Sequence, residues 1–245
     1  MNATLEWSIL LPAMVAGLMV LASHVPLGLR VLERGIIFID IAIAQFAGLG
    51  VILAHFLEWE AGWQVQAAAL GLAGLGALLL HFSEQHWPRR QEAVIGVAFV
   101  LVSSLAILLL AHDPHGGEQL REMLVGQILW TGWGDLPTLA LVTAGVLAAW
   151  FSGLRRSPLG FYLLFALAIT ASVQVVGVYL VFASLIVPAL AAGERLVRAY
   201  VMGTAGYVLG LAASALWDLP AGAAIVVALV LVAAPFMFIR KTDRV

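Results

Sequence analysis

The chain of 245 residues is 63% apolar and 11% charged, with a mean hydropathy of +1.04. This composition is typical of a protein that crosses a membrane many times, and it excludes an ordinary soluble domain. A net charge of −2 without a basic patch outside short loops predicts no nucleic-acid partner, and the lack of cysteine excludes disulfides and thiolate metal sites. We expect an all-α, polytopic transmembrane helical bundle that forms a single domain, residues 1–245, surrounded by membrane lipid.

Apolar runs divide the chain into about nine candidate spans. They cover residues 8–29, 36–57, 64–82, 93–111, 136–152, 159–176, 178–192, 200–217 and 221–239. A hydrocarbon core of about 30 Å needs about 20 helical residues, so the region 159–192 is either two short spans or one long broken helix. The sequence therefore predicts a bundle of eight or nine spans.

The basic residues favour nine spans, because eleven of the twelve then lie on one side of the membrane and only Arg121 lies on the other. These eleven are Arg30, Arg34, Arg89, Arg90, Arg155, Arg156, Arg195, Arg198, Arg240, Lys241 and Arg244. Short cytoplasmic loops carry an excess of Lys and Arg. We therefore predict a multi-pass protein of the cell inner (plasma) membrane, with its N-terminus outside and its C-terminus in the cytoplasm.

The stretch PLGLRVLERGIIFIDIAIAQFAGLG brings a carboxylate, Asp40, into the second span shortly after a basic turn. A charge inside the membrane costs roughly 2.5–3.5 kcal/mol on insertion scales, so such a residue is a candidate for function. The alternative is a structural carboxylate satisfied near Arg34. Gln45 faces about 140° away from Asp40 on an ideal helix, which favours packing between helices over a joint ligand pair.

Histidines supply the other candidate ligands of a metal ion. His24 lies in the first span before Pro26, and it is either a hydrogen-bonded structural residue or a ligand. The loop HDPHGGEQLREM holds His112 and His115 among three acidic residues, a set of ligand types that suits zinc or manganese. Its alternative is a solvated polar loop built on turn residues. The candidate metal ligands are thus Asp40, Gln45, His24, His112 and His115.

Three stretches, in this order along the chain, resemble the membrane permease of ABC importers for zinc, manganese and iron. The family follows its basic turn with a Gly-Asp-x-x-x-His-Ala-type segment; here Asp40 matches and Ala44 stands at the histidine position. LVGQILWTGWGDL resembles the family's Leu-Phe-Gly-Asp-Ile-Leu, with Gln127 in place of the aspartate. VQVVGVYLVFASLIVPALAA resembles its Val-Gly break and its helix ending Ile-Pro-Ala-Ala-Thr-Ala, through Gly177 and the pair Pro188-Ala189.

This resemblance runs from about residue 10 to residue 236, and it implies a transport subunit with no catalytic residues and no tightly bound cofactor. It implies a homodimeric pore, separate ATP-binding subunits, and a periplasmic binding protein that delivers a divalent metal ion. The single lysine, Lys241, excludes a Gly-Lys-Ser/Thr phosphate loop in this chain. Ala44 argues against assuming zinc, because imidazole suits zinc whereas carboxylates suit harder ions such as manganese.

Two alternatives remain open. The family carries a cytoplasmic coupling helix after its fifth span, whereas here Arg155-Arg156-Ser157-Pro158 passes directly into the next span. This favours a secondary metal transporter or channel with the same fold but no ATPase. The pieces Asp40, Gly132-Trp133-Gly134-Asp135 and Pro188-Ala189-Leu190 also resemble an intramembrane aspartyl protease. Its two carboxylates must share one water, but here they would lie on the order of 20 Å apart in a core of ~30 Å.

Overall fold

The structure, a computed structural model, describes residues 3–59, 61–193 and 195–239. Within these residues the chain is all-helical, as predicted. Nine apolar helices correspond one to one to the nine predicted spans. They are α1 (Ala3–Arg34), α2 (Ile39–Phe56), α3 (Gly62–His86), α4 (Gln91–Leu110), α6 (Leu136–Phe151), α7 (Pro158–Val176), α8 (Val178–Ala192), α9 (Leu196–Trp217) and α10 (Ala221–Ile239).

A short helix, α5 (Gly116–Val125), occupies most of the segment that was predicted to be a polar loop. The loop prediction is wrong from Gly116 onward. Leu120, Met123 and Leu124 recur at helical spacing and form an apolar stripe, and the last two pack against the main core. Three single 3₁₀ turns complete the described secondary structure: η1 (Pro88–Arg90), η2 (Ile128–Trp130) and η3 (Leu154–Arg156).

The region 159–192 consists of two helices, α7 and α8, which meet at Gly177. Six of the helices, α1, α2, α3, α4, α7 and α9, are long and apolar enough to span a membrane. The helices α6, α8 and α10 are shorter apolar helices of the same bundle. The predicted count of eight or nine spans therefore agrees with the nine apolar helices among the residues that the structure describes.

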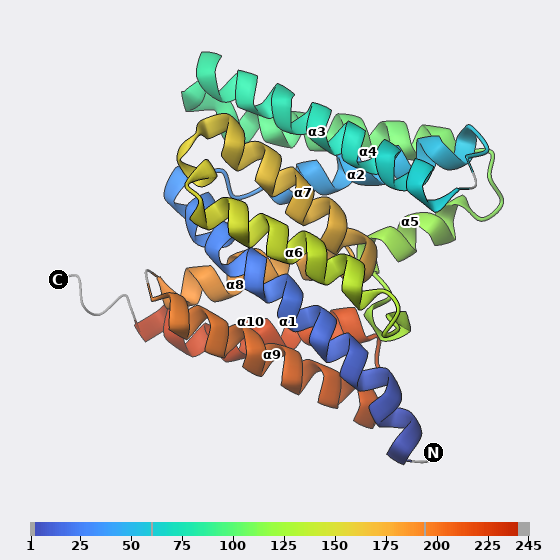
Figure 1. Ribbon diagram of the computed structural model, residues 1–245, viewed down its shortest axis with the longest axis vertical. Helices are drawn as coiled ribbons and strands as arrows, with labels where there is room; N and C mark the ends of the chain where they lie inside the picture. Colours follow the sequence, from blue (N-terminus) through green and yellow to red (C-terminus); the bar gives the residue numbers. More distant parts are fainter. Residues whose placement is uncertain (1–2, 60, 194, 240–245) are drawn as a thin grey trace.

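Successive apolar helices run in opposite directions, so that their connections gather at two ends of the bundle, at the left and the right in Figure 1. The left side of Figure 1 holds the connections 35–38, 87–90 and 152–157, together with the end of α8 and the start of α9. We call this side the basic end. These segments carry or adjoin the eight described arginines of the predicted cytoplasmic set. The remaining three basic residues of that set, Arg240, Lys241 and Arg244, lie outside the described residues. Arg121 belongs to α5, at the opposite end.

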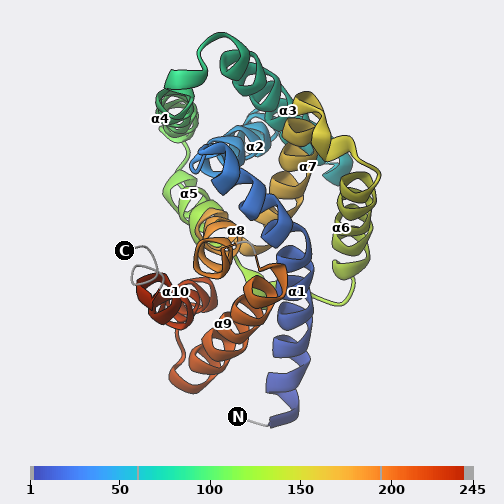
Figure 2. The same ribbon diagram turned by 90° about the vertical axis from the view of Figure 1, so that its left-hand side faces the viewer.

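Figure 2 looks onto the basic end and shows α1, α2 and α8 in the middle of the bundle, with the other helices around them. The central helices are closely packed: Ile43 of α2 and Leu185 of α8 are completely buried. The outer helices expose large apolar side chains, such as Val97 on α4 and Leu231 on α10. Exposed apolar faces of this kind suit contact with lipid chains.

Glycines permit the close approach of several helices, because a residue without a side chain lets two backbones come together. Gly28 of α1 lies against the backbone of Leu185 in α8, and Gly206 of α9 lies against Leu229 of α10. In α3, a Cβ on Gly76 would meet the ring of Phe46, whereas Gly71 and Gly74 face open space.

Candidate functional site

Asp40 occupies the first turn of α2, at the basic end, and is 1% exposed. Neither carboxylate oxygen has a hydrogen-bond partner among the described residues. The structural alternative predicted that Arg34 would satisfy it, but the Arg34 guanidinium lies 3.6 Å from the Glu84 carboxylate and 4.3 Å above the ring of Phe161. Asp40 forms no ion pair within the described chain. A buried acidic side chain without a side-chain partner is a candidate ligand for a cation, because carboxylate oxygens act as acceptors and ligands.

Glu92, in the first turn of α4, brings a second carboxylate to the start of α2. Its Oε1 accepts a hydrogen bond of 3.2 Å from the backbone N–H of Phe38, two residues before Asp40. Its Oε2 is buried and has no partner among the described residues. Sequence reasoning missed Glu92, since it follows Arg89 and Arg90 and therefore reads as part of a solvated basic turn.

Next to Glu92, Gln91 fixes the start of α4 against the neighbouring helices. Its side chain accepts from Ser83 Oγ at 2.6 Å, and its Nε2 donates to the Leu80 carbonyl at 2.9 Å and to the Tyr162 hydroxyl at 3.2 Å. This buried network joins α3, α4 and α7. It holds the first turn of α4, and with it Glu92, in a fixed position beside α2.

Gln45 is buried in the middle of α2, and its side-chain oxygen has no partner among the described residues. It lines a mostly apolar cavity of about 540 Å³ between α2, α4, α5, α8 and α10. Ser103 of α4 lines the same cavity, and its hydroxyl is also unpartnered within the described chain. Asp40 is not among the residues of this cavity, in agreement with the helical spacing that separates it from Gln45.

His24 is completely buried in α1. Its Nδ1 lies 2.9 Å from the Val20 carbonyl oxygen and 3.1 Å from Ser23 Oγ. Because a carbonyl only accepts, the bond to Val20 places the ring proton on Nδ1 and leaves Nε2 with a free lone pair. Nε2 has no hydrogen-bond partner in the described residues. One ring nitrogen therefore fits the structural interpretation, while the other retains the donor atom that a metal ligand needs.

His112 and His115 lie exposed on the turn between α4 and α5. The backbone N–H of His115 donates to Asp113 Oδ1 at 2.8 Å, which orders the turn rather than a metal site. Across the described residues, no group of three or more His, Cys, Asp or Glu side chains is close enough to hold a metal ion. The five predicted ligands thus remain spread over α1, two levels of α2 and this turn.

A polar cavity of about 560 Å³ lies at the end of the bundle opposite the basic end, between α2, α3, α5 and α7. The polar side chains that line it are His55, Gln119, Glu122, Gln127 and Gln174. Sequence reasoning did not predict this cavity. Its signal was the pair of amides that interrupts two apolar runs, one in the third span and one in the sixth.

That amide pair consists of Gln66 on α3 and Gln174 on α7. Gln66 Nε2 donates to Gln174 Oε1 at 2.5 Å, and Gln174 Nε2 donates back to Gln66 Oε1 at 3.1 Å. Gln174 also faces a second cavity, of about 530 Å³, on its other side, together with Thr138 and Asp135. Gln174 therefore lines both cavities, and Gln66 lines the second.

The protease arrangement does not form. Asp40 begins α2 at the basic end, whereas Asp135 precedes α6 at the opposite end (Figure 1). Asp135 Oδ2 accepts from the backbone N–H of Gly132 at 2.8 Å, so this carboxylate shapes the turn that leads into α6. Pro137 stands in the first turn of α6, a usual place for proline at a helix start.

The family model described as the ABC 3 transport family matches residues 6–240. The chain belongs to the ABC 3 transport family. The predicted resemblance is therefore confirmed, and so is the prediction that the chain is a transport subunit rather than an enzyme. A search of curated protein sequences finds no match.

Several solved structures share the fold, among them the following two. PsaBC from Streptococcus pneumoniae, solved in complex with a Fab, has a TM-score of 0.71 and 22% identity, over 95% of this chain and 89% of that chain. A structure described as a metal-chelate type ABC transporter in an inward-facing conformation has a TM-score of 0.70 and 17% identity, over 99% and 90%. This ABC 3 chain thus has the multi-pass membrane permease fold across nearly its whole length.

In this ABC 3 chain the connection between α6 and α7 is short. It contains six residues, 152–157, of which three form the turn η3. No helix longer than three residues lies in the connections 35–38, 87–90 and 152–157 at the basic end. The coupling helix expected from the resemblance is accordingly not formed between α6 and α7, as the sequence departure predicted.

Proposed function

We propose that this chain is the membrane subunit of an ABC importer that moves a divalent metal ion, namely zinc, manganese or iron, into the cytoplasm. Two copies would form the pore, separate ATP-binding subunits would drive it, and an external metal-binding protein would deliver the ion. Membership of the ABC 3 transport family supports the transport role. The observation that supports a cation as the transported substrate is Asp40, a buried carboxylate with no partner in the described chain.

We further propose that the basic end faces the cytoplasm. The described arginines of the predicted cytoplasmic set gather there, and cytoplasmic loops are rich in Lys and Arg. This orientation puts the N-terminus outside, the C-terminus inside, and the cavity with His55 and Glu122 on the side from which an imported ion arrives.

Helix α2 connects that cavity with Asp40. Residues 40, 44, 47, 51 and 55 are three or four positions apart and share one face of the helix. The last three of these line the outer cavity, and the first is Asp40. Ala44 and Ala47 between them are each 1% exposed, so the face is tightly packed in this conformation. We infer that an ion passes along this face when the helices around α2 move apart.

The side chains on this route favour a hard cation. Asp40 and Glu92 supply carboxylates at the basic end, while Ala44 supplies no imidazole in the middle of the helix. Carboxylates suit manganese and similar ions, whereas imidazole suits zinc. Manganese or iron(II) is therefore the favoured cargo over zinc.

A second candidate is a secondary transporter or channel with the same fold but no ATPase. The six-residue connection between α6 and α7 favours it, because no coupling helix lies there. Uptake of radiolabelled zinc, manganese and iron(II) into proteoliposomes, with and without a co-purified ATPase and ATP, separates the candidates. ATP-dependent uptake supports the importer and names its ion. Uptake without ATP supports the second candidate, and no uptake under either condition contradicts both.

A further inference from the structure

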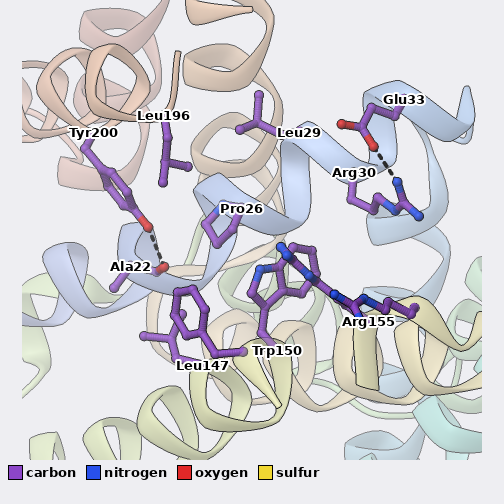
Figure 3. Close-up of a pocket in the computed structure, with 12 residues that line it drawn as sticks. Ala22, Pro26, Leu29, Arg30, Glu33, Leu147, Trp150, Arg155, Leu196 and Tyr200 are labelled. Atoms are coloured by element: carbon purple, nitrogen blue, oxygen red, sulfur yellow. Dashed lines mark hydrogen bonds and ion pairs between the residues drawn. The ribbon is translucent and has the colours of Figure 1, made fainter. Parts of the chain in front are cut away.

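A cavity of about 530 Å³ opens at the basic end between α1, α6 and α9 (Figure 3). Figure 2 shows α6 and α9 on either side of α1 at this place. Three arginines, Arg30, Arg155 and Arg156, line the cavity together with apolar side chains that include Leu29, Leu147 and Phe151. None of the predicted metal ligands lines it, so it is separate from the proposed ion route.

The charge in this cavity is positive. Arg30 forms a 2.6 Å ion pair with Glu33, which is the acidic residue of the lining. The guanidinium of Arg155 lies 5.2 Å from the centre of the Trp150 ring. Neither Arg155 nor Arg156 has a carboxylate partner among the described residues. The three arginines and one glutamate give the cavity a net positive charge, which favours an anion beside the two unpaired arginines.

The rest of the cavity is apolar and extends toward the middle of the bundle. It reaches Ala22 on α1, eight residues before Arg30, which corresponds to about 12 Å along the helix. The Ala22 carbonyl would lack a partner, because Pro26 has no N–H to donate. The Tyr200 hydroxyl donates to it at 2.9 Å instead. The inner wall therefore has its polar atoms satisfied and presents an apolar surface.

We propose that this cavity binds an anionic phospholipid from the membrane leaflet at the basic end. The phosphate lies beside Arg155 and Arg156, and an acyl chain follows Leu29, Leu147 and Pro26 toward Ala22. Basic pockets between membrane helices bind anionic headgroups in this manner. The proposal does not rest on the identity of the transported metal ion.

The depth of the cavity favours a lipid over a protein segment. A loop of another subunit that reached the level of Ala22 would bring backbone polar groups into the hydrocarbon region without partners, whereas an acyl chain has none to satisfy. A free phosphate ion would contact the arginines but would leave the apolar walls uncovered. A lipid fills both parts.

The test measures lipid retention by native mass spectrometry on the full chain, delipidated in detergent and titrated with phosphatidylglycerol or with phosphatidylcholine of the same acyl chains. We expect preferential retention of phosphatidylglycerol. The double variant Arg155→Ala/Arg156→Ala should weaken that binding about 25-fold, since each arginine near the surface contributes about fivefold. Both arginines are exposed, so the variant should elute as a folded protein in size-exclusion chromatography.

The matched control is Arg89→Ala/Arg90→Ala, which removes the same charge from another connection at the basic end that does not line the cavity. This variant should retain phosphatidylglycerol like the wild type. An equal loss in both double variants would mean diffuse surface attraction and would overturn the proposal. Leu147→Trp, which fills the apolar part and keeps the charge, should also weaken retention.

Two further measurements distinguish the other occupants. Competition by glycerol 3-phosphate at the same concentration as the lipid would show that the site takes a free phosphate, and that would overturn the proposal. Capture of the co-purified ATPase is then measured with both double variants. If the Arg155/Arg156 variant keeps its lipid and loses the ATPase, this surface is a subunit contact and the lipid site is rejected.

Discussion

Gly126 and Gly177 lie backbone against backbone where the connection after α5 crosses the junction of α7 and α8. A Cβ on Gly177 would stand 2.6 Å from the Cα of Gly126. Both residues have positive φ, +71° and +79°, which side-chain-bearing residues rarely adopt. Gly222, at the start of α10, approaches the Val125 carbonyl in the same region. Three segments that are far apart in the sequence therefore depend on one crossing.

Gly177→Ala should lower the stability of the bundle by at least about 3 kcal/mol, because it adds a backbone clash to an unfavourable φ. The control is Gly35→Ala, which has a φ of +69° but no atom within 4 Å of the added Cβ, so it should cost only about 1–2 kcal/mol. Thermal unfolding followed by size-exclusion chromatography in detergent measures both. Equal shifts of the midpoint would show that the contact with Gly126 contributes nothing.

The hydrogen bond from Tyr200 to Ala22 gives a second stability prediction. Tyr200→Phe leaves the Ala22 carbonyl beside Pro26 without a donor, and it should cost about 1 kcal/mol. Tyr179→Phe is the matched control, because Tyr179 is 55% exposed and its hydroxyl makes no hydrogen bond in the described chain. The same thermal measurement should separate the two variants, and equal midpoints would contradict the role of Tyr200.

The helices could be predicted from the sequence because core and lipid both select apolar residues, so each span appears as one long apolar run. The break at Gly177 was visible for the same reason, as a glycine within a run too long for one span. The helix α5 was missed, since its apolar stripe of three residues lies among charged residues that suggest a loop. A hydropathy value averages over many neighbouring residues, so it does not detect an apolar stripe of three residues.

The site was predicted less completely than the fold. Asp40 could be identified from the sequence, because a carboxylate within an apolar span cannot be explained as a residue exposed to water. Glu92 did not stand out, since its partner Phe38 lies 54 positions earlier and only the packing of α4 on α2 brings them together. Likewise, the polar side chains of the cavity at the opposite end come from several helices. One of them, Gln174, bonds to Gln66, which lies 108 positions away in the sequence. Contacts of this range are set by tertiary structure and leave no local pattern.

The exposed histidines before α5 should affect only the capture of a scarce ion. Changing His112 and His115 together to alanine should reduce uptake at limiting metal and leave it unchanged at saturating metal, because neither side chain belongs to a buried site. His86→Ala, on the basic end, serves as the control for loss of an exposed histidine. Uptake is measured over a range of metal concentrations. A loss that persists at saturation would mean that the turn is structural.

Asp40 should be essential for transport but not for folding. Asp40→Ala should abolish metal-dependent uptake and Asp40→Asn should lower it. Neither change should unfold the protein, because the carboxylate makes no hydrogen bond in the described chain that its removal would break. Asp218→Asn, in an exposed aspartate at the end of α9, is the control. Uptake in proteoliposomes is compared after the variants are shown to elute as wild type does. Wild-type uptake in both Asp40 variants would remove this residue from the ion route.

Glu92 allows the charge of the second carboxylate to be separated from its hydrogen bond. Glu92→Gln keeps an acceptor for the Phe38 N–H but loses the charge, whereas Glu92→Ala loses both. If the charge acts on the ion, Glu92→Gln should lower uptake several-fold without changing the thermal midpoint. Wild-type uptake in Glu92→Gln together with a lower midpoint in Glu92→Ala would mean a structural role alone.

The double variant Asp40→Asn/Glu92→Gln decides whether the two carboxylates act on the same ion. Groups that bind one ion couple, so the double variant should lose less transport than the product of the single losses predicts. Independent carboxylates should give losses that multiply. The uptake rates of the four proteins of this cycle, measured at saturating manganese, give the coupling directly. A multiplicative result would leave Asp40 in the route and assign Glu92 to the support of α2.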